Sequence, residues 1–358
     1  MNSAAAASSE LSVINLAVER GQAEVLNGVS VTVPAGSVLA LLGLAGSGKT
    51  TLLRAIAGLE RPHRGSIRLG EKVFYDAGAR IDLPAEARGL GLVLKSYALW
   101  PHRTVLETVA YGLKLRGVAR SDIKARVSSM LSRLDLAHVA DQYPHQLSAI
   151  ERQRVALGRA LIYEPPLVLL DDPLSSLDPK LREEARAWLR YLIASLKVSA
   201  VVATNDQVEA MALADRIALL NNGAIEQEGS PIDLYREPAT LFAAEFMGNN
   251  NRLEGILVEN AHERAVIEVK GTHLEGLART KAAVGEKATG VIRLENVLLG
   301  GGRGANRILM SLKAQMYIGE RWELLFARDE LSVRTYVAAP LKHELYHVEF
   351  PSHALWIF

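Results

Sequence analysis

The segment "GLAGSGKT" (residues 43–50) restricts the possible fold more than any other part of this chain. It fits the pattern G-x-x-x-x-G-K-[ST] and ends a compact apolar run, "SVLALLGL", that is typical of a buried strand. The residues behind it, "TTLLRAIAGLE", have the spacing of a helix. Glycines let backbone N–H groups turn toward a phosphate, and a helix N-terminus favours negative charge. The segment predicts a phosphate-binding loop; a glycine-rich turn that matches by chance is the alternative.

This loop assigns expected roles to individual side chains. Lys49 is expected to bridge the β- and γ-phosphates of ATP, and the hydroxyl of Thr50 to hold Mg²⁺. A second predicted strand ends in "LVLLDD", so Asp171 is expected to hold Mg²⁺ through its water shell, with a solvated aspartate pair as the alternative. The residues expected to bind the nucleotide are Gly43, Leu44, Ala45, Gly46, Ser47, Gly48, Lys49, Thr50 and Thr51.

Further strands and helices alternate along the first two thirds of the chain. A third apolar run, "VSAVVATND", leads into residues 207–220, which we interpret as helical. Such alternation predicts a parallel sheet that is covered on both faces. Residues 96–161 are mainly helical in pattern, which indicates a helical insertion, and residues 221–223 are expected to form the turn of a hairpin.

The pattern changes near residues 246–255. Short alternating strands separated by turn residues follow, which predicts an all-β barrel or sandwich of about a hundred residues. We therefore expect two domains, an ATP-binding domain at residues 1–248 and a β-domain at residues 249–358.

Composition narrows the function classes. The 41 Lys and Arg residues nearly balance the 40 Asp and Glu residues. The chain as a whole therefore has no strong positive electrostatic field that would attract nucleic acid or an anionic membrane surface. The chain has no cysteine, which excludes thiol catalysis and thiolate metal sites. No apolar run reaches the ~20 residues that span a bilayer. The start, "MNSAAAASSE", lacks the features of a signal peptide and is interpreted as a frayed end. The chain is cytoplasmic in character.

Five collinear segments resemble the motifs of one family, the ATP-binding subunits of ABC importers. They are "GLAGSGKT", "SYALWPHRTVLETV", "LSAIERQRVALGRAL", "PLVLLDDPLSSLD" and "VVATNDQVEAMALADRIALLNNGAIEQEGSPIDLYREP". The resemblance implies an α/β P-loop domain of the RecA-like, ABC type with a helical insertion. The tail, with "VIRLENVLL" and "YIGERWELLF", is similar to the OB-type regulatory barrel of the subfamily that serves sugars, polyamines, ferric iron and related solutes.

The resemblance also implies partners. In the family, two such subunits enclose two ATP molecules with Mg²⁺, each between the phosphate loop of one subunit and the signature segment of the other. They drive integral membrane permease subunits, act indirectly with a solute-binding protein, and lie peripherally on the cytoplasmic face of the bacterial inner membrane. Tyr97 and Trp100 are expected to help line the permease-binding groove, or alternatively to pack inside the insertion.

The signature segment departs from the family pattern. The family is expected to have Ser-Gly-Gly-Gln, which grips the γ-phosphate across the dimer interface. This chain keeps Ser148 but has Ala149 and Ile150, where glycine would permit close approach of the backbone. Glu151 adds a carboxylate near an anionic ligand, which is expected to repel it.

Four more positions depart from the pattern. Asp172 replaces the glutamate that orients the attacking water; it is shorter by one methylene, and ~1 Å of misplacement can cost about a hundredfold in rate. Asn205 replaces the switch histidine and cannot supply an imidazolium. Lys95 replaces a glutamine that contacts Mg²⁺; its ammonium cannot bind a metal but could contact phosphate. Arg20 stands where an aromatic ring would stack on adenine, and a guanidinium can also stack.

These departures predict ATP binding with impaired hydrolysis, and a heterodimer with an intact second ATP-binding subunit. The site on Lys49 and Asp171 would lack proper catalytic residues. The other site would combine the partner's catalytic residues with Ser148, and we expect residual turnover there. A non-hydrolysing regulatory or structural subunit is the main alternative. A nucleic-acid ATPase is disfavoured by the balanced charge, and a GTPase by "ATND", which is no guanine-reading motif.

Overall fold

The computed structural model describes residues 10–21, 23–300 and 306–358. The expected frayed end, "MNSAAAASSE", falls almost entirely outside these residues. The chain divides into two compact units, Met1–Ile232 and Asp233–Phe358, each with its own hydrophobic core.

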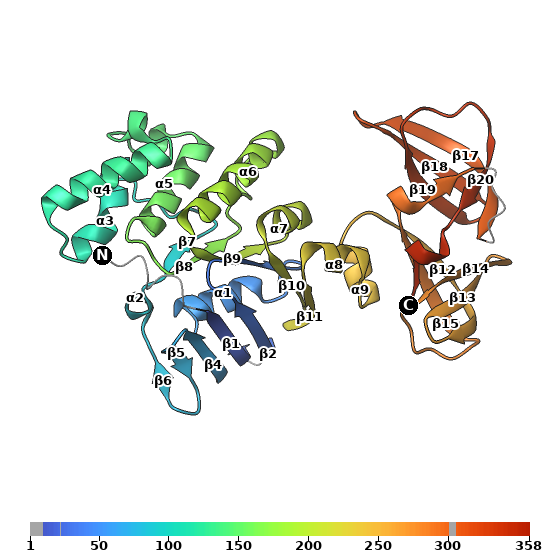
Figure 1. Ribbon diagram of the computed structural model, residues 1–358, viewed down its shortest axis with the longest axis horizontal. Coiled ribbons are helices and arrows are strands. Elements are labelled where there is room, and N and C mark those ends of the chain that lie inside the picture. The colour runs from blue at the N-terminus through green and yellow to red at the C-terminus, as the bar shows by residue number, and fades with distance from the viewer. Residues whose placement is uncertain (1–9, 22, 301–305) are drawn as a thin grey trace. The chain divides into compact units, whose positions relative to one another are not determined.

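The first unit contains two sheets (Figure 1). The antiparallel sheet has the order β2-β1-β4-β5-β6, with β1 Leu11–Arg20, β2 Ala23–Val33, β4 Arg64–Leu69, β5 Lys72–Asp76 and β6 Ile81–Asp82. The second sheet has the order β11-β10-β3-β9-β8-β7, with β3 Val38–Leu42, β7 Gly91–Val93, β8 Leu167–Asp171, β9 Ser199–Thr204, β10 Arg216–Asn221 and β11 Ala224–Gly229. From β10 to β7 all neighbours are parallel, which confirms the predicted parallel sheet.

The prediction that residues 207–220 form one helix is wrong in its second half. Helix α7 (Gln207–Leu213) is short, and the chain then enters β10 beside β3. Residues 217–220 are fully buried, because both faces of a parallel sheet are covered. A short run that is apolar on every side fits such a strand as well as a helix, so periodicity alone did not separate them. The predicted turn after it is confirmed, with Asn221 paired to Ala224 in the β10–β11 hairpin.

Helix α1 (Lys49–Ala57) joins the two sheets into one core. Its apolar side chains Leu52, Leu53 and Ile56 are fully buried among residues of both sheets. Because β3, β8 and β9 are parallel, their carboxyl ends lie at the same edge of the sheet, where α1 begins. This topology brings the phosphate loop, Asp171 and Thr204 to one edge.

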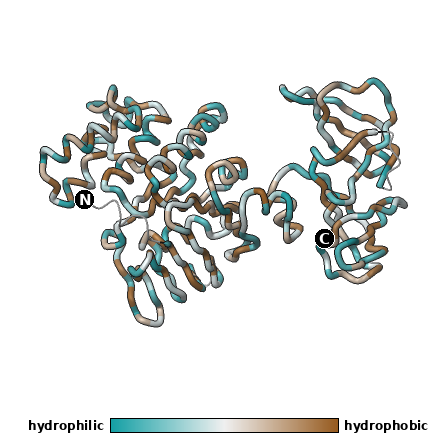
Figure 2. The backbone as a smooth tube through the Cα atoms, viewed as in Figure 1, coloured by the Kyte–Doolittle hydropathy of each residue, from teal (hydrophilic) through white to brown (hydrophobic). Residues whose placement is uncertain are grey.

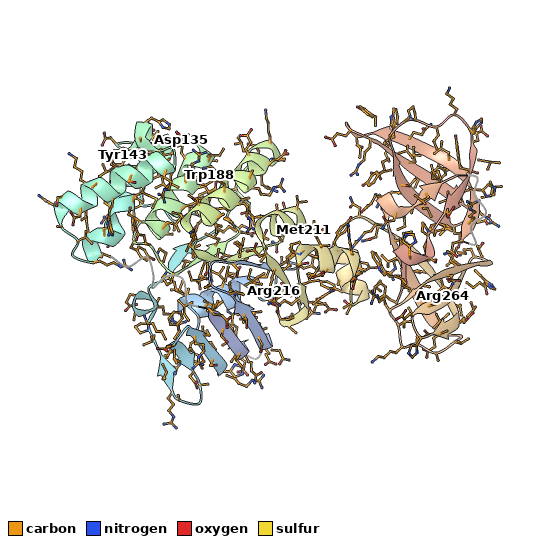
Figure 3. All side chains as sticks on the ribbon, in the orientation of Figure 1. Asp135, Tyr143, Trp188, Met211, Arg216 and Arg264 are labelled. Atoms are coloured by element: carbon orange, nitrogen blue, oxygen red, sulfur yellow. The ribbon has the colours of Figure 1, made fainter. Side chains whose placement is uncertain are left out.

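The helices of the predicted insertion gather at one end of the first unit (Figure 1). The remaining helices of this unit are α2 Ala85–Arg88, α3 Val105–Leu115, α4 Arg120–Arg133, α5 Ala149–Leu161 and α6 Pro179–Leu196. Arg154 fastens α5 to its neighbours: its guanidinium lies 3.1 Å from Asp135 and 4.7 Å from the ring of Trp188, two residues labelled in Figure 3.

Tyr97 and Trp100 differ in their surroundings. Tyr97 is only 5% exposed, and its hydroxyl donates to the carbonyl of Pro173, so it packs inside the unit and the groove expectation is wrong for it. Trp100 is half-buried and lies against the ring of Tyr111 and the guanidinium of Arg159.

The second unit is almost entirely β-structure, as predicted. A closed barrel has the order β12-β13-β14-β21-β15, with β12 Asn250–Ala261, β13 Arg264–Val269, β14 Thr272–Ala278, β15 Lys287–Arg293 and β21 Leu355–Ile357. A further sheet has the order β16-β20-β17-β18-β19, with β16 Leu298–Leu299, β17 Arg307–Tyr317, β18 Trp322–Arg328, β19 Leu331–Val337 and β20 Leu345–Glu349. One core of buried aliphatic and aromatic residues fills both, which is consistent with an OB-type barrel.

Two short helices, α8 (Pro231–Arg236) and α9 (Leu241–Phe246), precede the barrel. Arg293 of β15 is fully buried and ties them to it, donating to the carbonyls of Ala244 and Tyr235 at 2.8 and 3.0 Å. Its guanidinium also stacks on the rings of Tyr235 and Trp356. A buried cation with carbonyl and aromatic partners fixes this region more specifically than apolar packing alone.

Hydrophobic and hydrophilic stretches are interleaved along both units (Figure 2). In the part of the chain that the structure describes, no helix combines the length and the apolar character needed to cross a membrane.

Candidate nucleotide-binding site

An open cleft of about 440 Å³ lies over the phosphate loop, at the carboxyl edge of the parallel sheet. It brings together most of the residues predicted from the sequence, although they come from distant parts of the chain. Its lining residues are Arg20, Val25, Ala45, Gly46, Gly48, Lys49, Thr50, Thr51, Arg54, Lys95, Asp171, Asp172, Ala203 and Asn205. The signature residues 148–151 are not among them and lie at the start of α5.

The loop wraps around the ammonium of Lys49. The residue is 7% exposed, and its ammonium donates to the carbonyls of Gly43 and Leu44, both at 2.8 Å. Burial lowers the pKa of Lys49, and the charges of Asp172 and Asp171 oppose that shift. Gly48 is required at its position, because its φ is +103° and a Cβ atom would lie 2.6 Å from Leu26. The loop is thus built around a desolvated cation at a helix N-terminus, which suits a polyphosphate.

The predicted metal ligands fit Mg²⁺. The hydroxyl of Thr50 and a carboxylate oxygen of Asp171 lie 2.9 Å apart, so two oxygen donors converge at the mouth of the loop. Mg²⁺ prefers oxygen ligands and usually takes only one or two from the protein, with waters and phosphates completing its shell. Thr50 and Asp171 would hold it, and the bound ion would neutralise charge on the phosphates.

Asp172 is held in an ion pair. Its carboxylate lies 2.9 Å from the ammonium of Lys95, 77 residues away in the chain. The carboxylate side is 16% exposed and the lysine side 61%. This bond raises the pKa of Lys95, so the lysine stays charged. The Asp172 backbone is in the left-handed region, with φ +50°, and donates to the carbonyl of Ala203 at 2.8 Å. A carboxylate so engaged is poorly placed to accept a proton from water.

Asn205 lies at the cleft and is exposed. Glu209 lies four residues further along the chain, in α7, and was not predicted as a site residue from the sequence. Its side chain is 2% exposed and accepts from the hydroxyl of Thr204 at 2.9 Å. Burial raises the pKa of Glu209 to about 7, and the nearby charges of Asp206 and Asp172 add to the shift. The cluster around Asn205 therefore carries carboxyl groups but, within the cleft lining, no imidazole.

Arg20 lines the cleft, at the place expected for an adenine-stacking residue. Its guanidinium forms a two-bond pair with Glu60, at 3.0 and 2.6 Å, which raises the pKa of Arg20 and lowers that of Glu60. The pair fixes a flat cationic surface at the rim. The sequence reasoning also missed Arg54, which lies four residues after Thr50 and therefore on the same face of α1.

The signature segment forms a closed helix cap. Ser148 is the N-cap of α5: its hydroxyl accepts from the Glu151 N–H at 3.3 Å, and the Glu151 carboxylate accepts from the Ser148 N–H at 2.7 Å. These bonds and His138, 3.2 Å away, lower the pKa of Glu151. The carboxylate thus stays charged and occupies a backbone donor that would otherwise be available to a ligand.

This cap gives a testable stability effect. Ser148→Ala is expected to lower the free energy of unfolding of the first unit by about 1 kcal/mol, because α5 loses its N-cap acceptor. Urea unfolding followed by circular dichroism measures the change, with Ser148→Thr as the control that keeps the hydroxyl. Equal stability of all three proteins would show that the cap contributes nothing.

The chain is similar to proteins of known role. The family described as "ABC transporter" matches residues 26–175. The sulfate/thiosulfate import ATP-binding protein CysA of Mycobacterium bovis is 44% identical over 268 residues, which are 75% of this chain and 73% of that protein. CysA of Escherichia coli K12 is 45% identical over 251 residues, 69% of this chain and 67% of that protein. The trehalose/maltose import ATP-binding protein MalK of Thermococcus litoralis is 44% identical over 242 residues, which are 67% of this chain and 65% of that protein.

A solved structure agrees with this likeness. The dimeric ATP-binding cassette MJ0796, in a post-hydrolysis state bound to ADP and Pi, aligns with a TM-score of 0.54 at 28% identity. The alignment covers 62% of this chain and 98% of that one.

Proposed function

The chain belongs to the ABC transporter family as an ATP-binding subunit of the import type, and on that premise we propose that it drives solute uptake through membrane permease subunits. It binds ATP with Mg²⁺. In this role it lies peripherally on the cytoplasmic face of the bacterial inner membrane and acts indirectly with a solute-binding protein. Relatives of nearly equal identity are named for sulfate/thiosulfate and for trehalose/maltose import, so selection of the solute resides in the other subunits.

The chain's own hydrolytic site is impaired. The observation that carries this part of the proposal is the 2.9 Å ion pair between Lys95 and Asp172. It neutralises the carboxylate that would orient the attacking water, and it does so with a residue that cannot bind Mg²⁺. Asn205 adds no imidazole beside it. Lys49, Thr50 and Asp171 are all in place, which supports ATP binding without rapid turnover.

The working unit is a heterodimer with a second, intact ATP-binding subunit. In a homodimer both sites would carry every defect. With an intact partner, one site receives the partner's intact signature, and the other receives the partner's intact catalytic residues. The site that combines the partner's catalytic residues with Ser148 of this chain is the one that turns over. We propose the ATP-binding domain at residues 1–248 and the regulatory β-domain at 249–358, since the first barrel strand begins at Asn250, although residues 233–248 belong to the second compact unit.

The test compares two preparations: this chain alone, and the chain co-purified with an ATP-binding subunit encoded beside it. We expect slow hydrolysis of Mg-ATP by the chain alone and vanadate-sensitive turnover by the pair. In the pair, Asp172→Asn in this chain should leave turnover nearly unchanged, whereas Ser148→Ala should reduce it. Fast turnover by the chain alone overturns the impaired site. Failure to bind Mg-ATP in either preparation favours a purely structural subunit.

A further inference from the structure

The cleft carries more positive charge than its predicted phosphate loop requires. Four cationic side chains line it, Arg20, Lys49, Arg54 and Lys95, against two carboxylates, Asp171 and Asp172. Formal charges therefore give +4 − 2 = +2 for the lining. Arg20 is already committed to Glu60, which is not part of the lining. Of the other three cations in the lining, only Lys95 is exposed.

Lys95 lies close enough to Lys49 for the two charges to interact. The charge of Lys95 is one of the influences that lower the pKa of Lys49, and Asp171 is one of those that raise the pKa of Lys95. Both lysines and both aspartates thus belong to one electrostatic cluster at the mouth of the loop. The formal charges of these four side chains sum to zero. With the glutamine and glutamate of the family pattern at positions 95 and 172, the same sum would be −1.

The backbone next to Lys95 is fixed, while its side chain is exposed. Arg159 donates to the carbonyls of Tyr97 and Ala98 at 2.7 and 2.6 Å, and the Tyr97 hydroxyl donates to the carbonyl of Pro173, directly after Asp172. The Lys95 side chain itself is 61% exposed, and its hydrogen bond is to Asp172. Because the lysine side is exposed, water competes for its ammonium and weakens the pair.

We propose that Lys95 is a phosphate-binding residue that bonds to the γ-phosphate when ATP enters while it keeps its bond to Asp172, and that it supplies part of the charge that Mg²⁺ otherwise provides. This inference rests on the proposed function, since it presumes ATP in this cleft. An ammonium has three N–H donors, so Lys95 can hold the carboxylate and a phosphate oxygen together, and it gains a second anionic partner. ADP has no γ-phosphate, and with ADP the lysine is bonded to Asp172 alone. The site therefore favours ATP over ADP and binds ATP with weak dependence on Mg²⁺.

The experiment measures ATP and ADP affinity of the full-length chain by calorimetry, in Mg²⁺ and in EDTA. For the wild-type protein, ATP affinity is expected to fall less than about tenfold when Mg²⁺ is chelated. For Lys95→Gln, the fall in ATP affinity on chelation is expected to be at least about ten times larger than the fall for wild type. Lys95→Arg, which keeps the charge, should behave like wild type. Asp172→Asn should bind ATP more tightly in EDTA, because it removes a negative charge beside the phosphates. Lys124→Gln, on the exposed face of α4, is the matched control.

The outcomes separate the two proposals. Absence of ATP binding by the wild-type protein in Mg²⁺ overturns the proposed function itself. The second outcome is that the protein binds ATP in Mg²⁺, but Lys95→Gln and wild type lose the same factor in ATP affinity on chelation. This outcome overturns only the role of Lys95. ADP affinity serves as the folding control: a Lys95→Gln protein with normal ADP affinity has an intact cleft. If ADP binding is also lost in that variant, Lys95→Gln in the Asp172→Asn background decides. Removing Asp172 alone lowers the negative charge beside the phosphates whatever Lys95 does, and only a phosphate-binding Lys95 makes the second substitution cost ATP affinity.

Discussion

Lys49→Met is expected to weaken ATP binding by at least about a hundredfold, the largest loss that any single substitution in the cleft should produce. Lys49 is buried, at 7% exposure, and its ammonium lies inside the phosphate loop against the carbonyls of Gly43 and Leu44. A charge-assisted bond to phosphate made in such a place is not shared with water, and it is stronger than one made at the rim. Methionine keeps an unbranched apolar stem and removes the terminal ammonium, and with it the charge and its N–H donors. Calorimetry with Mg-ATP measures the loss.

Two further observations make this result specific. The carbonyls of Gly43 and Leu44 lose a donor in the variant, but the desolvation of a buried ammonium is also removed, so the unfolding midpoint should change little. Lys180→Met, an exposed lysine in the first turn of α6, is the control for loss of one positive charge. ATP affinity equal to wild type in a folded Lys49→Met protein would mean that nucleotide does not enter this loop.

The local parts of the site could be predicted from the sequence. The phosphate loop is a strand, a turn and a helix that follow one another, so residues 43–50 carry their own context. The same holds for Asp171 at the end of a buried apolar strand. Side-chain partners could not be predicted in this way. Lys95 and Asp172 are 77 residues apart, and Arg20 and Glu60 are 40 apart; only the strand order brings each pair together.

The errors in the fold have a similar origin. The pattern predicts a helix over residues 216–220, which lie in β10, because a short, buried apolar run has no polar face that would reveal its period. In the second unit, the three-residue strand β21 shows why a local pattern is not sufficient. β21 is too short to show alternation, yet it closes the barrel between β14 and β15. Its assignment depends on pairing with strands far away in sequence, which a local pattern does not contain.

Restoring the family pattern should restore hydrolysis to this chain alone. We expect Lys95→Gln, Asp172→Glu and Asn205→His together to raise its Mg-ATP turnover by at least about a hundredfold, provided that the signature is also restored. The triple change frees the carboxylate, lengthens it by one methylene and adds an imidazole. For the signature, Ala149→Gly and Ile150→Gly permit close approach of the backbone, at a cost of about 1 kcal/mol each in helix stability. Glu151→Gln removes the negative charge and keeps the reciprocal cap, since glutamine also serves at that position.

Turnover of the single and double variants at positions 95 and 172 shows whether hydrolysis is limited by the ion pair or by each side chain separately. Asp172→Glu alone should gain little, because the ammonium of Lys95 can follow the longer carboxylate. Lys95→Gln alone should also gain little, because the short carboxylate remains. Together they should gain more than the sum of the single effects, as expected for two groups in direct contact. Turnover is measured at saturating Mg-ATP, with ATP affinity determined in parallel. Additive effects of the two substitutions would show that the 2.9 Å pair does not limit hydrolysis, and that the barrier lies instead in the signature or at Asn205.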